Sequence, residues 1–210
     1  MASEDDRGPA YRVCTSRLVL RCWHPWDAPL LKAAVDESLE HLRPWMTWAS
    51  QEPERLQAKV ERLRRWRGAF DLGRDFAYGV FSPDEESVLG ASGLHTGVGD
   101  GAREIGYWIR VDHVNQGLAT EVAGALTKVA FEIDGVVRAE IHCDPRNVRS
   151  AAVPRKLGFV HEATLRRRTV DPNGERRDSM IWTLLLDEYG TSRARRAEIA
   201  AYDAIGRRIL

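Results

Sequence analysis

One stretch, residues 104–132, most constrains what this chain can fold into, because it joins a strand pattern to a helix pattern through a short turn. It begins with the alternation of a β-strand, in which Ile105, Tyr107 and Ile109 share one face. After a polar run it continues as a helix with one apolar stripe, formed by Leu118, Val122, Leu126, Val129 and Ile133. The sequence therefore predicts a strand–turn–helix unit.

The start of this helix has the properties of an anion-binding site, and its residues are Gln116, Gly117, Leu118, Ala119 and Thr120. Backbone N–H groups in the first helical turn have no partner within the helix, and the helix dipole makes the potential there positive. Gly117 and Ala119 have little or no side chain, so an anion can approach the backbone. The simpler alternative is a turn that needs Gly117 only for its conformational freedom.

Length and charge limit the class of protein. The chain has 210 residues, of which 43% are hydrophobic, and this is enough for one domain with its own core. Lysine plus arginine and aspartate plus glutamate both number 31, so the net charge is zero. A general nucleic-acid-binding protein would show a basic excess. We therefore expect no nucleic-acid partner.

The cysteines and the N-terminus indicate a cytoplasmic protein. Cys14, Cys22 and Cys143 are widely separated and have no metal-ligand spacing, so no metal site is expected, and an odd number of cysteines fits a reducing compartment. Residues 1–11 are polar and acidic, which predicts a disordered leader without a signal peptide. No apolar run reaches the length of about 18 residues that a transmembrane helix needs.

The rest of the chain alternates between strand and helix patterns. Strands are predicted at residues 17–22, 76–81, 88–95, 136–144, 159–170 and 175–186, and helices at 25–38, 54–73, 116–134 and 147–156. The strands at 76–110 are expected to form an antiparallel meander, and the turn residues at 171–174 predict a hairpin. We expect one domain over residues 12–187, followed by a helical tail over 188–210 that packs on the domain, meets a second copy or frays.

A second motif follows the first by about 30 residues. It has the form N-x-x-S-x-x-x-x-x-K-L-G-F and is made by Asn147, Ser150, Lys156, Leu157, Gly158 and Phe159. Together, the two motifs resemble motifs A and B of the GNAT superfamily of acyl-CoA-dependent N-acyltransferases. The segments SRLVLR, LRPWMTWA, EIGYWI, GLATE and KLGF are similar to the ribosomal-protein N-acetyltransferase (RimJ/RimL-like) branch. This resemblance spans roughly residues 15–187.

The resemblance implies an α+β fold. Its central sheet would be mixed but mostly antiparallel, with about seven strands flanked by helices, and it would be splayed at the acyl-CoA cleft, usually by a β-bulge. One departure is Val114, where the superfamily motif has Gln or Arg. Backbone amides provide most of the phosphate contacts, so we expect phosphate binding to survive, without a side-chain contribution from that position.

The resemblance also implies the residues that bind acetyl-CoA or another acyl-CoA as co-substrate. They are Ile109, Arg110, Val111, Gln116, Gly117, Leu118, Ala119, Thr120, Asn147 and Ser150. Backbone groups of Ile109 and Val111 would pair with the pantetheine arm, and a backbone N–H near Trp108 or Ile109 would stabilise the oxyanion. Ser150 would meet the leaving thiolate, although both Asn147 and Ser150 are also suited to cap a helix.

The implied reaction is direct attack of a primary amine on the thioester. Such an attack needs a neutral amine, and the candidates for the base are Glu104 and His95, either of which could instead be an ordinary strand-end residue. An α-amino group has a pKa of about 7.7–8.0 and is partly neutral at cellular pH. Cys143 is expected to pack in the core rather than to form an acyl-enzyme.

The acceptor side would be built by Trp45, Trp48 and Tyr107, although the two tryptophans could simply cap the core. The basic residues 166–168 could meet CoA phosphates or an acidic protein, or remain solvated. The expected activity is acyl transfer, most simply of acetyl, to a protein N-terminus or a small-molecule amine. The chain could act as a homodimer. The alternatives are another acyl group such as succinyl, a CoA-binding regulatory module without turnover, and a partner protein that uses the arginine-rich tail.

Overall fold

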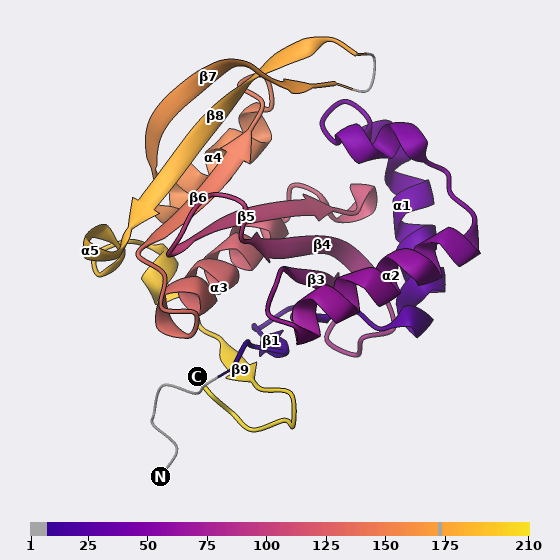
Figure 1. Cartoon of the computed structure of the whole chain (residues 1–210), viewed down its shortest axis with the longest axis horizontal. Coiled ribbons are helices and arrows are strands. Elements are labelled where there is room, and N and C mark those ends of the chain that lie inside the picture. Colours follow the sequence, from indigo (N-terminus) through magenta and orange to yellow (C-terminus); the bar gives the residue numbers. More distant parts are fainter. Residues whose placement is uncertain (1–7, 172–173) are drawn as a thin grey trace.

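The computed structural model describes residues 8–171 and 174–210 (Figure 1). Its centre is one sheet of nine strands in the order β7-β8-β6-β5-β4-β3-β2-β1-β9. The strands are β1 (Arg12–Cys14), β2 (Val19–Cys22), β3 (Phe76–Phe81), β4 (Val88–His95), β5 (Ala102–Ile109), β6 (Arg138–Cys143), β7 (Val160–Val170), β8 (Arg176–Leu185) and β9 (Ala200–Tyr202). Every neighbouring pair is antiparallel except β5 and β6.

Helices cover both faces of the sheet, and each face has its own hydrophobic core. The helices are α1 (Ala28–Leu42), α2 (Leu56–Asp71), α3 (Leu118–Glu132), α4 (Val148–Leu157) and α5 (Leu186–Tyr189). The apolar stripe of α3, with Val122 and Leu126, packs on Ile105 and Ile141 of the sheet. The other core packs Leu31 of α1 and the aromatic residues Trp23 and Phe81 together. Figure 1 shows α1 and α2 beside β3 and β4, and α3 below β5.

The parallel pair β5–β6 is short, and this opens the sheet. Only Ala102–Glu104 of β5 pair with β6, opposite Arg138–Glu140. Beyond Glu104 the two strands diverge, so within the described part of the chain one edge of β5 has no neighbouring strand there. The amide of Arg110 donates to Leu89 and the carbonyl of Gly106 accepts from Ser92, so the even-numbered residues of β5 face β4. The peptide groups of the odd-numbered residues therefore face the open edge.

The predicted fold class is confirmed, with two differences in the sheet. The sheet has nine strands rather than about seven, because β1 and β9 extend one edge and were not predicted. The splay is present, but the register of β5 on β4 is continuous from Gly90–Ile109 to His95–Glu104, so the expected bulge is absent from this pairing. The opening comes instead from the early end of the β5–β6 ladder.

Two predictions about the ends of the chain were wrong. The stretch expected to be a helical tail contains α5, the short 3-10 helix η4 (Ala194–Arg196) and the strand β9. Its alanines at 200 and 201 pair with β1, because the exposed edge of β1 offers them backbone hydrogen bonds. A weakly amphipathic helix in this stretch would be no more stable than this pairing. Ala10, placed in the leader, is fully buried and accepts a hydrogen bond from Tyr78 Oη at 2.7 Å. Residues 1–7 lie outside the described part of the chain, as does the middle of the predicted 171–174 turn.

Within the described residues, no helix combines the length and the apolar character that crossing a membrane requires.

Candidate active site

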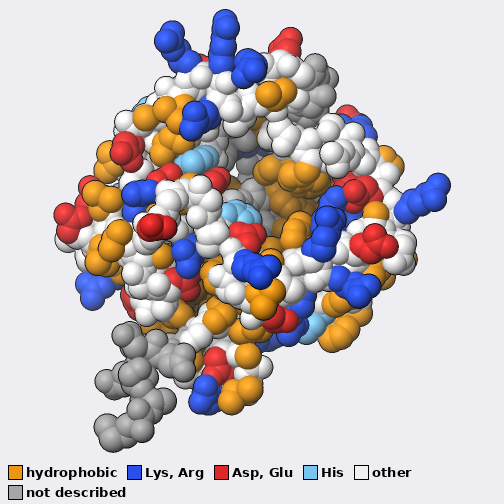
Figure 2. Space-filling view, viewed as in Figure 1, with side chains coloured by type: hydrophobic (Ala, Val, Ile, Leu, Met, Phe, Trp, Pro, Cys, Tyr) orange, Lys and Arg blue, Asp and Glu red, His pale blue; other side chains and the backbone are white. Residues whose placement is uncertain are grey.

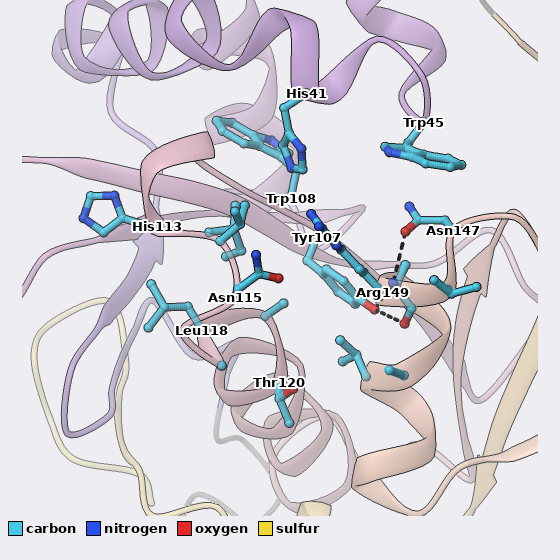
Figure 3. A pocket seen from close by; sticks show the side chains of 18 of the residues that line it. His41, Trp45, Tyr107, Trp108, His113, Asn115, Leu118, Thr120, Asn147 and Arg149 are labelled. Carbon is cyan, nitrogen blue, oxygen red and sulfur yellow. Dashed lines mark hydrogen bonds between the residues drawn. The ribbon is translucent and has the colours of Figure 1, made fainter.

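The open edge of β5, the start of α3 and the first turns of α4 enclose a cavity of about 430 Å³ (Figure 3). Most residues that the sequence assigned to acyl-CoA line this cavity: Ile109, Gly117, Leu118, Ala119, Thr120, Asn147 and Ser150. Arg146, Arg149 and Lys156 add positive charge to its wall. The cavity therefore combines an unpaired strand edge, a helix start and cations, which suits an extended amide ligand that carries phosphates. We call it the donor compartment.

Gly117 lies in the wall of this compartment, at the start of α3. Its φ of +81° lies in the left-handed region, which only glycine adopts without strain, and it forms the N-cap of α3. The amides of Thr120 and Glu121 donate to the Gly117 carbonyl, so the amides of residues 117–119 precede the first hydrogen bond of the helix. Arg17 holds this helix start in place, because its guanidinium donates to Glu121 Oε2 at 2.5–2.8 Å and to the Gln116 carbonyl at 3.1 Å.

Three of the predicted acyl-CoA residues do not line the donor compartment. Gln116 lies just outside it, with its side-chain amide on the Asp112 carbonyl at 3.3 Å. The Arg110 side chain pairs with Glu37 of α1 at 2.5 Å. The amide of Val111 donates to Ser38 Oγ at 3.1 Å and is therefore committed to α1. Of the two residues expected to pair with pantetheine, Ile109 faces the open edge and Val111 does not offer its N–H.

A cluster of hydroxyl groups lies where the donor compartment meets the sheet. Tyr107 Oη is 3.2 Å from both Ser150 Oγ and the Ser150 carbonyl oxygen (Figure 3). Asn147 caps α4 by accepting the Ser150 amide at 3.1 Å. The capping role therefore belongs to Asn147, and Ser150 Oγ remains available beside Tyr107. Burial raises the pKa of Tyr107 far above its ordinary value, so this phenol stays protonated.

A second cavity, of about 380 Å³, lies on the other side of β5 and faces α1 and α2. Met46, Tyr107 and Trp108 line both cavities, so the two meet at these three residues. Trp48 lines the second cavity, whereas Trp45 lines the donor compartment. Figure 2 shows the molecule hollowed between the β7–β8 hairpin and α1, with hydrophobic side chains gathered on the α1 side. We call the second cavity the acceptor compartment.

His95 lies in the wall of the acceptor compartment and is oriented by its neighbours. Its Nδ1 is 2.9 Å from Asp75 Oδ1. A Cβ atom added at Gly93 would lie 2.5 Å from His95 Nε2, and one at Gly106 would lie 3.5 Å away, so the imidazole occupies space that these two glycines leave. The hydrogen bond to Asp75 raises the pKa of His95 in spite of partial burial, and the charge of Glu104 acts in the same direction.

Glu104, the other predicted base, lies opposite His95 in the β4–β5 ladder. Its Oε1 is 3.6 Å from His142 Nδ1, and His142 Nε2 is 2.7 Å from Glu140. Glu104 does not line either the donor or the acceptor compartment. Cys143 is buried, and this burial raises the pKa of its thiol, in keeping with the predicted packing role.

Sequence reasoning missed Asp75, Gly93 and Arg17. Asp75 directly precedes β3 and resembles any polar residue at a strand start. Gly93 is an ordinary small residue in a strand pattern. Arg17 contacts Glu121 across more than 100 positions of sequence. Each contact joins segments far apart in the chain, and one sequence carries no signal for it.

Comparison with known proteins places this geometry in a family. Residues 17–160 match the model of the family described as acetyltransferase (GNAT) domain, which is more than half of the chain. The chain therefore belongs to the GNAT family. It is 28% identical over 159 residues to [Ribosomal protein uS5]-alanine N-acetyltransferase of Escherichia coli strain K12, a match that covers 73% of this chain and 80% of that protein. It is an acyl-CoA-dependent N-acetyltransferase of the RimJ/RimL-like kind, and the predicted class and co-substrate are confirmed.

Solved structures share the fold. RimJ of Mycobacterium smegmatis in complex with CoA-disulfide superposes with a TM-score of 0.75 at 24% identity, covering 90% of this chain and 91% of that one. RimL, the ribosomal L7/L12 alpha-N-protein acetyltransferase, in complex with coenzyme A gives 0.75 at 20% identity, covering 83% and 97%. A self-immunity acetyltransferase, MccE, in complex with acetyl-CoA and AMP gives 0.74 at 17% identity, covering 81% and 93%.

Proposed function

We propose that the acceptor is the α-amino group of a protein N-terminus, of the ribosomal-protein type that the named relatives acetylate. The observation that carries this proposal is the meeting of the two compartments at Tyr107 and Trp108, with the Asp75–His95 pair on the acceptor side. An α-amino group, with a pKa near 8, needs only a modest base, whereas a lysine side chain at about 10.4 needs a stronger one. His95 suits the first task.

His95 is the base in this proposal. Asp75 accepts the hydrogen bond from His95 Nδ1–H, which leaves Nε2 with a free lone pair on the side of Gly93 and Gly106. Nε2 takes one proton from the ammonium form of the acceptor, directly or through water. The neutral amine then attacks the thioester carbon. Glu104 stays outside the compartment and supports the positive charge on His95.

The negative charges that develop on the thioester oxygen and on the leaving sulfur are stabilised at the open edge of β5 and at α4. Charge that develops on the thioester oxygen is stabilised by the Ile109 N–H, because odd-numbered amides of β5 face the open edge. When the carbon–sulfur bond breaks, Ser150 Oγ donates to the thiolate, and Tyr107 Oη supports Ser150. The nitrogen loses its second proton, so the products are the amide, CoA thiol and one proton released.

Binding of the co-substrate phosphates is assigned to the amides of residues 117–119 and to the cations Arg146, Arg149 and Lys156. Acetyl-CoA supplies the activated acyl group. A homodimer and a cytoplasmic location remain part of the proposal; the second is supported by the three cysteines, all of which are free.

The test is a thiol-release assay in which acetyl-CoA is offered with N-terminal peptides, lysine peptides and polyamines. Mass spectrometry of the products then locates the acetyl group. Acetylation of the α-nitrogen of the peptides supports the proposal. Acetylation of lysine side chains alone, with no α-acetyl product, would overturn it.

A further inference from the structure

The acceptor compartment is lined mainly by tryptophan. Trp23, Trp48, Trp66 and Trp108 lie in its wall, which uses four of the seven tryptophans of the chain, together with Leu31 and Val35. Trp23 is buried in the core, but the other three are only partly buried. Pairs of these rings lie 6.2 Å apart between centroids, Trp48 with Trp108 and Trp23 with Trp66. The flat apolar rings of these tryptophans therefore line the acceptor compartment from separate segments of the chain.

The charged groups beside this cavity compensate one another. Lys59 and Arg62 reach its wall, and both pair with carboxylates: Lys59 Nζ contacts Glu52, and Arg62 Nη2 is 2.6 Å from Glu54 Oε1. Arg62 Nη1 is also 3.3 Å from Glu52 Oε1. The two cations are thus matched by two carboxylates. Since these cations and carboxylates pair with one another, the described wall of the cavity offers a phosphate or carboxylate ligand no free cation, and it offers a polycation no free anion.

Among the described residues that line the cavity, His95 is the side chain suited to receive an amine, because Lys59 and Arg62 are cations. The Ser92 hydroxyl, also in the wall, already donates to the Gly106 carbonyl at 2.7 Å. A volume of about 380 Å³ lies in the range of about 300–1,000 Å³ that pockets for small molecules occupy, and the methyl group of an alanine would fill little of it. The unfilled part is apolar and aromatic.

We infer that the acceptor carries a large apolar or aromatic group next to its primary amine, and that this group packs between the tryptophans of the acceptor compartment. This inference rests on the proposed function, since it specifies the acceptor of the same site. Two kinds of molecule carry a primary amine beside such a group. One is a protein N-terminus with an aromatic or large aliphatic side chain at its first or second position, and the other is a free arylalkylamine. Polyamines, aminoglycosides and peptides that begin with charged residues are excluded.

The experiment measures kcat/KM with acetyl-CoA for two peptide series. One series varies the first residue and the other the second, each through Phe, Trp, Leu, Ala, Ser, Asp and Lys; phenethylamine, tryptamine and spermidine are measured beside them. We expect the aromatic and leucine members of at least one series to exceed alanine and serine by about tenfold or more. Equal values across both series would overturn the acceptor class while leaving the proposed α-amino function intact.

Turnover of the arylalkylamines alone would support the acceptor class and overturn the protein N-terminus as its source. Turnover of spermidine alone would overturn the acceptor class.

Variants of one tryptophan connect the preference to this cavity. Trp48→Ala should lower kcat/KM for the preferred acceptor about tenfold or more, and should lower it less for the alanine member of the same peptide series. Trp48→Phe, which keeps a ring, should restore most of the preference. The matched control is Trp26→Ala, because Trp26 is 71% exposed and stacks on His24, away from the residues that line this cavity. A preference that survives Trp48→Ala unchanged would contradict the inference.

Discussion

Tyr107 Oη and Ser150 Oγ lie 3.2 Å apart, although 43 positions separate the two residues in the chain. The contact joins β5 to the first turn of α4 across the gap where the sheet opens. It therefore places two hydroxyl groups at the point where the donor and acceptor compartments meet. The chemical step should depend on both hydroxyl groups more than the binding of acetyl-CoA does.

Ser150→Ala should lower kcat by about 100-fold, which is the lower limit typical of a lost proton-transfer group. Tyr107→Phe should have a smaller effect of the same kind, because it removes only the supporting hydroxyl. The affinity for CoA, measured by calorimetry, should change little in both variants, since Asn147 still caps α4. An unchanged kcat in Ser150→Ala would show that this hydroxyl does not act on the leaving thiolate.

Gly117→Glu should abolish CoA binding, because the new carboxylate would lie where the phosphates bind and the residue would be strained at φ +81°. Gly135→Glu is the matched control. Gly135 has φ +65° beyond the other end of α3, and a Cβ there meets no atom within 4 Å. The control carries a similar backbone strain of about 1–2 kcal/mol without touching the cavity. Calorimetric titration with CoA should separate the two variants, and equal affinity in both would contradict the assignment of the anion site.

Asp75→Asn should shift the acid limb of the profile of kcat/KM against pH to lower pH. Asp75 raises the pKa of His95 above its usual value of 6.5, and the base must be neutral to act, so activity of the native enzyme rises as pH increases through this raised pKa. Removing the carboxylate charge of Asp75 lowers the pKa of His95, and the acid limb of the profile therefore moves to lower pH. The pKa of the acceptor is the same in both assays, so the difference belongs to His95.

The control for this measurement is Asp100→Asn, an exposed carboxylate in the β4–β5 turn, which should leave the limb in place. A limb that does not move in Asp75→Asn would remove His95 from the role of base.

Gly93→Ala should reduce activity with little loss of stability. The added methyl group would lie 2.5–2.6 Å from atoms of the His95 ring, so the imidazole has to leave its position beside Asp75. The ring is the end of a side chain and can move at a small cost in folding free energy. Gly97→Ala, in the open loop after β4, should keep full activity. Assays of kcat and a urea melt of both variants test this, and a fully active Gly93→Ala would contradict the proposed position of the ring.

Lys59→Met should destabilise the protein by about 3–5 kcal/mol, the usual effect of removing one partner of a buried ion pair. The side chains of Lys59 and Glu52 are 1% and 0% exposed. Burial disfavours the charge on Glu52, but the hydrogen bond from Lys59 and the nearby Arg62 hold its pKa below the usual value. The contribution of the Glu52 charge to folding stability is therefore fully present above the pKa that Glu52 has in the unfolded chain. It is lost as pH falls through the lower pKa that Glu52 has in the folded protein.

Urea denaturation at neutral pH measures the change, with Lys32→Met as control, because Lys32 forms a half-exposed pair with Asp36. A stability of Lys59→Met equal to that of the control would show that the pair contributes nothing.

Most strands and helices could be predicted because their apolar spacing reflects burial on one face. The helix at 116–134 and the strands at 76–81 and 88–95 match α3, β3 and β4 closely. The strand β9 could not be predicted, since the three residues Ala200–Tyr202 are too few to show a strand pattern and form a strand only because the edge of β1 lies beside them. Local sequence does not encode which edge is available.

The donor compartment was predicted better than the acceptor compartment. The backbone before α3 needs a residue with a left-handed φ, and Gly117 fills this position. A glycine at the start of a helix pattern is visible in the local sequence. The Asp75–His95 pair and the tryptophan wall instead come from segments between residues 23 and 108 that meet only in the folded chain. Trp45 and Trp48 are three positions apart and line different cavities. Their spacing in the sequence does not predict which cavity each of them lines.

The open edge of β5 has a consequence for handling the protein. An unpaired strand edge is a template on which other chains can add, and proteins usually cover such edges. Here the backbone groups of Tyr107 and Ile109 lie within a cleft that acyl-CoA binding would cover. We expect concentrated solutions of the ligand-free enzyme to self-associate more readily on storage than solutions that contain CoA, so the co-substrate also protects the protein against aggregation.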